Sequence, residues 1–192
     1  MLNSKLMCWV ALDRAIELAD VLAPSEDELS RWHSERGRIR TAILERGTDP
    51  ETGAFTQAFG SAVMDASALR VALVGFLPGD DPRVLATIAA VRDRLTDDEG
   101  FVHRYEGEDG LEGKEGSFLL CTFWLAHAQA LAGDADGARA TFELAAGVRN
   151  DVDLLAEEYG DGQLLGNLPQ AFSHIGLITA AAAITACEAG LR

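Results

Sequence analysis

The chain is poor in cysteine, in basic residues and in signals for a membrane, and each shortage argues against a class of protein. Its 192 residues include three cysteines, Cys8, Cys121 and Cys187, all inside apolar helical patterns. This placement favours buried free thiols over disulfides or metal ligands, and it indicates a reducing, cytoplasmic compartment. The 16 basic residues face 31 acidic ones, a net charge of −15. That balance disfavours nucleic acid and anionic membranes as partners and suits a neutral ligand such as a sugar.

Motifs for membranes, metals and cofactors are equally scarce. The longest apolar run, 175–187, is too short to span a bilayer and is rich in alanine, so it predicts a buried helix. The N-terminal residues enter a helical pattern directly, without the features of a secretory signal. The four histidines show no metal-ligand spacing, and there is no Gly-rich phosphate loop. We therefore expect no metal, no cofactor and no membrane association.

Almost every periodic segment has helical spacing, and successive segments alternate in character. The sequence predicts seven helices, at 4–22, 25–46, 65–76, 81–95, 115–131, 136–148 and 169–188. The first, third, fifth and seventh are apolar on most sides, whereas the others are amphipathic. A helix that is apolar all round is buried between layers, and a one-sided helix covers the outside. The alternation predicts an all-α toroid with inner and outer rings, although a helical solenoid could show similar alternation.

The long loops point to the functional face. Three long connections, 47–64, 96–114 and 150–168, each precede an apolar helix, whereas the connections in the other direction are short. Loops of this length inside a helical domain are uncommon unless they are functional. In a toroid, loops that all precede inner helices emerge on one rim. We therefore expect the active site on that rim.

Each long loop carries candidate residues. In the third, Glu157 and Glu158 are adjacent acids that would usually be solvated surface, but the apolar residues before them and the rim position favour function. In the second, Arg104 offers a planar fork of donors for sugar hydroxyls, although such an arginine is often only an ion-pair partner; the loop also holds the Gly-rich, charged stretch 109–116. The first, at 53–61, holds aromatic and amide groups that suit sugar binding or core packing equally.

Several of these segments together resemble a known family. The matching segments, in order along almost the whole chain, are 4–15, 65–67, 75–83, 115–124, 154–159 and 166–174. They resemble bacterial glycoside hydrolases of family 15, the glucoamylase and trehalase type. The resemblance implies an (α/α)6 barrel of twelve helices and hydrolysis of terminal α-glucosidic bonds with inversion. In that chemistry a carboxylate base and a carboxylic acid lie roughly 6.5–9.5 Å apart on opposite sides of the bond.

The resemblance also assigns roles to residues. It places the general base on Glu157, and it gives Arg104 a role in binding the sugar next to the cleaved bond. Glu158, Gln170 and His174 lie in well-matched motifs, and we hypothesise that they also face the substrate. The substrate itself, whether trehalose, a maltooligosaccharide or a glucan end, stays open.

One family feature is absent from the sequence. The family's general acid is a Glu that follows a Trp, shortly before the helix matched here by 4–22, and no Trp-Glu pair occurs in this chain. Residues 1–192 therefore resemble the C-terminal part of a family catalytic domain, and we expect a partial barrel of seven helices that supplies the base but not the acid. Alone it should have little or no activity, and inner helices such as 118–131 should expose apolar sides.

That incompleteness leads to expectations about partners. The chain should form a homodimer, pair with an N-terminal half-barrel, or aggregate. The alternative to an enzyme is a non-catalytic half-barrel that acts in interaction or sugar binding. A weaker alternative is another toroid enzyme, such as a sugar epimerase.

Overall fold

The computed structural model describes residues 1–107 and 116–191 of the chain, and most of them lie in helices. The helices are α1 (Leu2–Glu17), α2 (Ala19–Leu22), α3 (Glu26–Arg46), the 3-10 helix η1 (Ala66–Leu69), α4 (Arg70–Leu73), α5 (Pro82–Arg94), α6 (Leu119–Leu131), α7 (Ala135–Gly147) and α8 (Ala171–Glu188). The strands are β1 (Ser117–Phe118), β2 (Glu158–Gly160) and β3 (Gln163–Leu165).

Two helix starts follow the local signals in the sequence. The Ser25 hydroxyl accepts a hydrogen bond from the Glu28 amide at 3.3 Å, and the Glu28 carboxylate accepts one from the Ser25 amide at 3.0 Å. This capping box begins α3, as predicted. The Asp81 carboxylate accepts a hydrogen bond from the Arg83 amide at 2.9 Å, with Pro82 as the first residue of α5.

Three predicted helices differ in detail from the observed ones. The segment 4–22 is divided at Leu18 into α1 and α2, and 65–76 is a 3-10 turn followed by the single turn of α4. In the segment 115–131, α6 begins at Leu119 because the two residues before it pair with β2 instead of continuing the helix. The predicted start at 115 lies outside the described residues.

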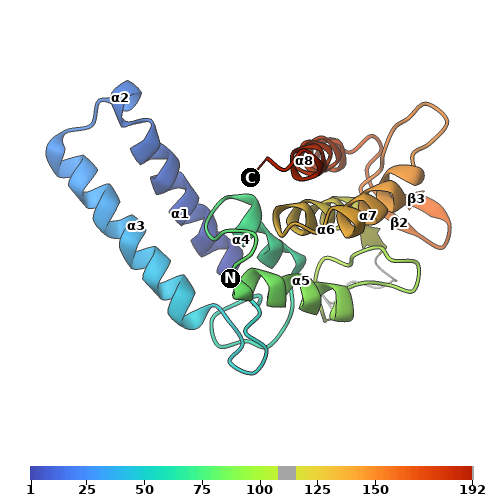
Figure 1. The fold of residues 1–192 in the computed structure, drawn as a ribbon, viewed down its shortest axis with the longest axis horizontal. Coiled ribbons are helices and arrows are strands. Elements are labelled where there is room, and N and C mark those ends of the chain that lie inside the picture. Colours follow the sequence, from blue (N-terminus) through green and yellow to red (C-terminus); the bar gives the residue numbers. More distant parts are fainter. Residues whose placement is uncertain (108–115, 192) are drawn as a thin grey trace.

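The helices form two groups joined by the middle of the chain. In Figure 1, α1 and α3 lie side by side in one arm, and α6, α7 and α8 form the other, with α4 and α5 between them. Helix α6 packs against α7, α8, α4 and η1, which makes it the central helix. Its Phe123 is fully buried, with the ring centroid 5.7 Å from that of Phe142 on α7.

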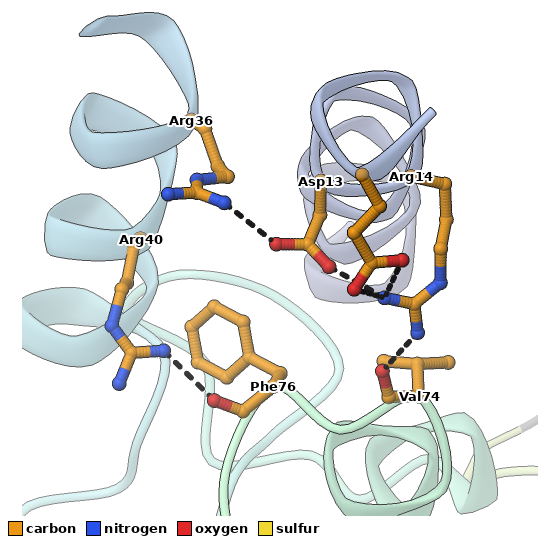
Figure 2. A network of polar contacts seen from close by, with 7 residues as sticks. Asp13, Arg14, Arg36, Arg40, Val74 and Phe76 are labelled. Carbon is orange, nitrogen blue, oxygen red and sulfur yellow. Dashed lines mark hydrogen bonds and ion pairs between the residues drawn. The ribbon is translucent and has the colours of Figure 1, made fainter. Parts of the chain in front are cut away.

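Charged side chains join the first arm to the middle of the chain (Figure 2). Asp13 on α1 is 9% exposed and accepts hydrogen bonds from Arg36 on α3 at 2.9 Å and from Arg14 at 2.5 Å. Arg40, also on α3, donates to the carbonyl oxygen of Phe76 at 2.8 Å. A buried carboxylate needs such partners, so this network fixes α1 and α3 relative to each other and to the turn after α4.

The exposed apolar surface lies elsewhere than predicted. The prediction that 118–131 has a solvent-facing apolar side was wrong, because α7, α8 and the η1–α4 segment cover α6 and leave most of it buried. The large apolar side chains that are more than half exposed on helices lie on α8 and at the end of the first arm: Phe172, Ile175, Ile178, Leu18, Val21 and Leu22.

Helix α8 also bears on the question of membranes. It is the one described helix whose length and apolar composition would allow a membrane crossing, with 22% of its residues buried. A single helix of this kind is weak support for a membrane span. The expectation that 175–187 forms a buried helix was wrong for most of its residues, because one side of α8 is left uncovered.

A small antiparallel sheet links the long loops. Its order is β1-β2-β3, with Ser117 opposite Tyr159 and Tyr159 opposite Leu164. An isolated bridge joins Asp65, at the end of the first long loop, to Tyr105 in the second. The three loops are therefore hydrogen-bonded to one another near the starts of η1, α6 and α8, as expected for a common rim.

Candidate functional site

Glu157 lies where the start of α6 meets the segment before α8. Its carbonyl oxygen accepts a hydrogen bond from the Leu119 amide at 3.1 Å, and its amide donates to the Asn167 carbonyl at 3.0 Å. Both backbone groups are therefore held by other parts of the fold, and the position of the Cα atom is fixed from two sides.

The first turn of α8 holds the two residues that precede Glu157. The Gln170 amide donates to the Leu155 carbonyl at 2.9 Å, and the Leu155 amide donates to Nε2 of His174 at 3.2 Å. The Ser173 hydroxyl, fully buried, donates to the Ala156 carbonyl at 2.7 Å. Since Leu155 and Ala156 are each 1% exposed, these contacts satisfy backbone groups that water cannot reach.

The side chain of Glu157 is partly exposed and held through one oxygen. Its Oε2 accepts hydrogen bonds from Asn167, at 2.8 Å from Nδ2 and 3.3 Å from the amide. Gly166, with φ +72°, brings the chain so close that an added Cβ atom would lie 3.0 Å from the same oxygen. Within residues 1–107 and 116–191, no donor binds Oε1. One oxygen is fixed and the other is available to a ligand or to water.

Glu158 is placed differently from its neighbour. Successive side chains of an extended chain point to opposite sides. The Glu158 carboxylate accepts a hydrogen bond from the Gly116 amide at 3.0 Å, in the sheet where Glu158 pairs with Phe118. The two adjacent acids therefore have separate surroundings.

Arg104 contributes to a cavity of about 490 Å³ beside the start of α6. Its guanidinium lies 4.8 Å from the ring centre of Phe118 and 4.7 Å from that of Tyr105, and it donates to the Tyr105 hydroxyl at 3.0 Å. The lining also includes Gln57, from the first long loop, and Trp124 on α6. Aromatic faces with polar groups around them suit a sugar ring.

The predicted site residues do not all line one cavity. Among the described residues that line the Arg104 cavity, Arg104 is the one predicted site residue. The cavity and Glu157 nevertheless meet at the start of α6. The Leu119 amide donates to the Glu157 carbonyl, and Leu119 lies in the sequence between the lining residues Phe118 and Leu120. The other two predicted substrate contacts, Gln170 and His174, bind backbone amides of the protein. The Gln170 side chain accepts a hydrogen bond from the Phe172 amide, and the His174 ring accepts one from the Leu155 amide.

The remaining candidates from the long loops have structural surroundings. In the first loop, Phe55 is fully buried and Phe59 lies between Lys5 and Arg46, with the cations 5.1 and 4.9 Å from the ring centre. These aromatics therefore pack against the protein. Most of the stretch 109–116 in the second loop lies outside the described residues.

Sequence reasoning assigned no role to a Ser, His, Asp group near β1. The Ser117 hydroxyl donates to Asp97 at 2.6 Å and lies 3.3 Å from Nδ1 of His103. Ser117 is 1% exposed, and its proton is directed to the carboxylate, not to the imidazole. The group therefore anchors the loop before β1 and lacks the arrangement of an activated nucleophile.

A metal centre finds no support in the described part of the chain. No group of three or more His, Cys, Asp or Glu residues there could hold a metal ion. The site consists of one anchored carboxylate and a neighbouring aromatic cavity with an arginine.

These features define a partial α/α toroid with an anchored carboxylate among its rim loops. The sequence profile of the Glycosyl hydrolases family 15 matches residues 1–182, and the chain belongs to this family. The structure superposes on a glycosidase variant in complex with glucose, with a TM-score of 0.80, 23% identity, and coverage of 96% of this chain and 52% of that one. A bacterial glucoamylase complexed with acarbose gives a TM-score of 0.79 at 16% identity, covering 96% of this chain and 33% of the other.

Curated relatives include trehalases from bacteria and archaea. The trehalase of Mycolicibacterium smegmatis is 41% identical over an alignment of 191 residues, which covers 97% of this chain and 28% of the relative. The trehalase of Thermoplasma acidophilum is 38% identical over 180 residues, 93% of this chain and 31% of the relative. The chain thus spans less than a third of the length of the curated relatives it matches. The partial (α/α)6 toroid expected from the sequence is confirmed by the fold of these neighbours.

Proposed function

We propose that the chain is the base-supplying part of an inverting α-glucosidase, and that Glu157 activates the attacking water. The observation that carries this proposal is the state of its carboxylate: Oε2 is held by Asn167, while Oε1 accepts no hydrogen bond from the described residues. A general base must be fixed in position and have an oxygen within reach of the proton that it removes. The anchored Oε2 supports the first requirement, and the position of Oε1 supports the second.

The proposed reaction moves one proton to the base and one proton from the acid. Oε1 of Glu157 accepts a proton from water as the water oxygen attacks the anomeric carbon, and the bond from that carbon to the glycosidic oxygen breaks on the opposite face. A carboxylic acid on that face protonates the leaving oxygen. No Trp-Glu pair occurs among the 192 residues, so we propose that a polypeptide segment other than these residues supplies this acid.

We propose that Arg104 binds the sugar beside the reacting bond. Its guanidinium is held against Phe118 and Tyr105 at the lining of the aromatic cavity, and a guanidinium is the kind of group that binds oxygen atoms through a planar fork of N–H donors. For Gln170 and His174, the contacts favour a role in holding the segment of Glu157. Contact of either residue, or of Glu158, with substrate stays a prediction.

Trehalose is the first substrate to test. The relatives with 38–42% identity are trehalases, whereas the glucoamylase is 16% identical. This difference favours a disaccharide with an α-linkage at both anomeric carbons over glucan chain ends.

We further propose that the exposed apolar faces are where the rest of a ring packs. The stripe Phe172, Ile175 and Ile178 runs along α8, and no charged side chain interrupts this helix between Ala171 and Cys187. A face of this kind is typical of a surface that a partner covers. Packing of a second copy on the same face, which would give a homodimer, is the competing outcome.

A chimera provides the experiment. The segment of the M. smegmatis trehalase that aligns with this chain would be replaced by this chain. Hydrolysis of trehalose would be followed through the NMR signals of the released α- and β-glucose. We expect no turnover by the isolated chain, and turnover by the chimera with one anomer of each kind. The substitution Glu157→Gln should reduce kcat by about 10²–10⁴-fold.

The matched control is Glu143→Gln, since the Glu143 side chain is 65% exposed and pairs with Arg139 on the same helix, α7. It should leave the activity unchanged. Full activity of the Glu157→Gln chimera would refute the assignment of the base. Activity of the isolated chain would refute the claim that this chain lacks the general acid. Trehalose binding without hydrolysis in the chimera would favour a non-catalytic sugar-binding module. An Ile178→Glu substitution that prevents association of the isolated chain, but not activity of the chimera, would favour the homodimer.

A further inference from the structure

We infer that Asn167 is a positioning residue, which holds one oxygen of Glu157 so that the other faces the attacking water. The inference rests on the proposed role of Glu157 as the base. Sequence reasoning included Asn167 only within a matched motif and gave it no role.

The contacts between the two residues are reciprocal. The Asn167 side-chain amide and backbone amide both donate to Oε2 of Glu157, at 2.8 and 3.3 Å. The Glu157 amide in turn donates to the Asn167 carbonyl at 3.0 Å. Two donors on one oxygen and a backbone contact restrict rotation of the carboxylate about its last torsion angles. A terminal carboxyl torsion is otherwise broad, so this restraint determines where Oε1 points.

The chemistry of an asparagine fits this task better than that of its isosteres. Its side-chain amide donates without adding charge, so the carboxylate keeps its capacity to accept a proton. An aspartate of the same shape would put a second carboxylate against Oε2, and like charges at this distance repel. Gly166 permits the close approach, because a side chain there would contact Oε2 itself.

Asn167 is also suited to a clean test. It is exposed, so truncation leaves no cavity in the core and should change stability little. Asn150 is a matched control in the same long loop: its side-chain oxygen accepts from the amides of Val152 and Leu154, at 3.1 and 2.8 Å, without touching Glu157. Asn150→Ala removes these two side-chain hydrogen bonds from loop structure alone, whereas Asn167→Ala removes one, from Nδ2 to Glu157.

The kinetic test uses the chimera with trehalose as the substrate. Asn167→Ala should lower kcat by about 10- to 100-fold with little change in KM, because a misdirected base slows the chemical step without weakening sugar binding. Asn167→Asp should lose at least as much, although it conserves shape, and Asn150→Ala should keep kcat. Equal kcat values for wild type and Asn167→Asp, or an equal loss in Asn150→Ala, would overturn the inference.

A second measurement uses the isolated chain and needs no activity. In ¹⁵N–¹H spectra, the Asn167 side-chain amide signals should move on Glu157→Gln and stay in place on Glu143→Gln. Signals that ignore Glu157→Gln would overturn the inference even if the chimera were inactive. If the Glu157→Gln chimera loses activity while the Asn167→Ala chimera keeps the kcat of the wild type, the role of Asn167 alone is refuted. A fully active Glu157→Gln chimera would instead refute the proposed base.

Discussion

Removal of the Ser173 hydroxyl tests whether the start of α8 supports the segment that carries Glu157. The hydroxyl is fully buried and donates to the carbonyl of Ala156, which is 1% exposed and immediately precedes Glu157. In the Ser173→Ala variant this carbonyl loses its hydrogen-bond donor at a place that water cannot reach. The segment from Leu155 to Glu157 should then be held less firmly on α8.

The size of the effect follows from two opposing contributions. Leaving a buried acceptor without its donor costs about 1–3 kcal/mol. Alanine is a better helix former than serine by about 0.5 kcal/mol, and this difference offsets part of the loss. We expect the free energy of unfolding to fall by about 1–2 kcal/mol, and Tm by a few degrees for a chain of this size.

The assay is chemical unfolding followed by far-ultraviolet circular dichroism, with Thr185→Ala as the control. The Thr185 hydroxyl is exposed and donates to the Ala181 carbonyl within α8, at 2.9 Å. Its removal should be neutral or slightly stabilising, because it affects one helix and no contact between segments. Equal changes in the two variants would refute the reasoning, since they would indicate that the Ser173 contact adds nothing beyond helix propensity.

Two further predictions concern stability. In Gly79→Ala, the new Cβ atom would overlap the carbonyl of Leu131 at the end of α6, so the free energy of unfolding should fall by about 1–3 kcal/mol. In Gly37→Ala, within α3, the new Cβ atom would lie in open space, so the free energy of unfolding should rise by about 0.5–1 kcal/mol in the same assay. Burial lowers the pKa of His127 below its ordinary value of 6.5, so the unfolded chain binds more protons and the protein loses stability as the pH falls through that value. Unfolding measured at about pH 7.5 and 5.5 should show a smaller loss in His127→Gln, and an unchanged difference would count against the burial argument.

The helical architecture could be predicted because it depends on long patterns in the sequence. A segment such as α7, with Ala138 and Ala145 on its buried side, repeats its apolar positions over several turns. Caps such as Ser25 add a local signal for the start. These features act within one helix, and they need no knowledge of what the helix packs against.

The sheet and the support of Glu157 could not be predicted because they depend on contacts between distant segments. Strand β1 has two residues, too few to show any periodicity. The donors Asn167 and Ser173 follow their acceptors, Glu157 and Ala156, by 10 and 17 positions. A loop in between sets these pairings, and a single sequence does not encode its path in any repeated pattern.

The contacts that hold Glu157 suggest how an active site can be divided between two parts of a ring. The residues that fix its backbone and carboxylate come from the start of α6 and from the segment between Glu157 and α8, with Leu119 and Asn167 as the direct partners. Helix α6 is itself largely covered by α7 and α8. If Glu157 is the base as proposed, its geometry is built inside this chain, and the proposal requires only the acid and the other side of the sugar site from elsewhere. Under the same proposal, helices that packed on the exposed Phe172 would lie beside the turn whose Ser173 and His174 hold the residues before Glu157.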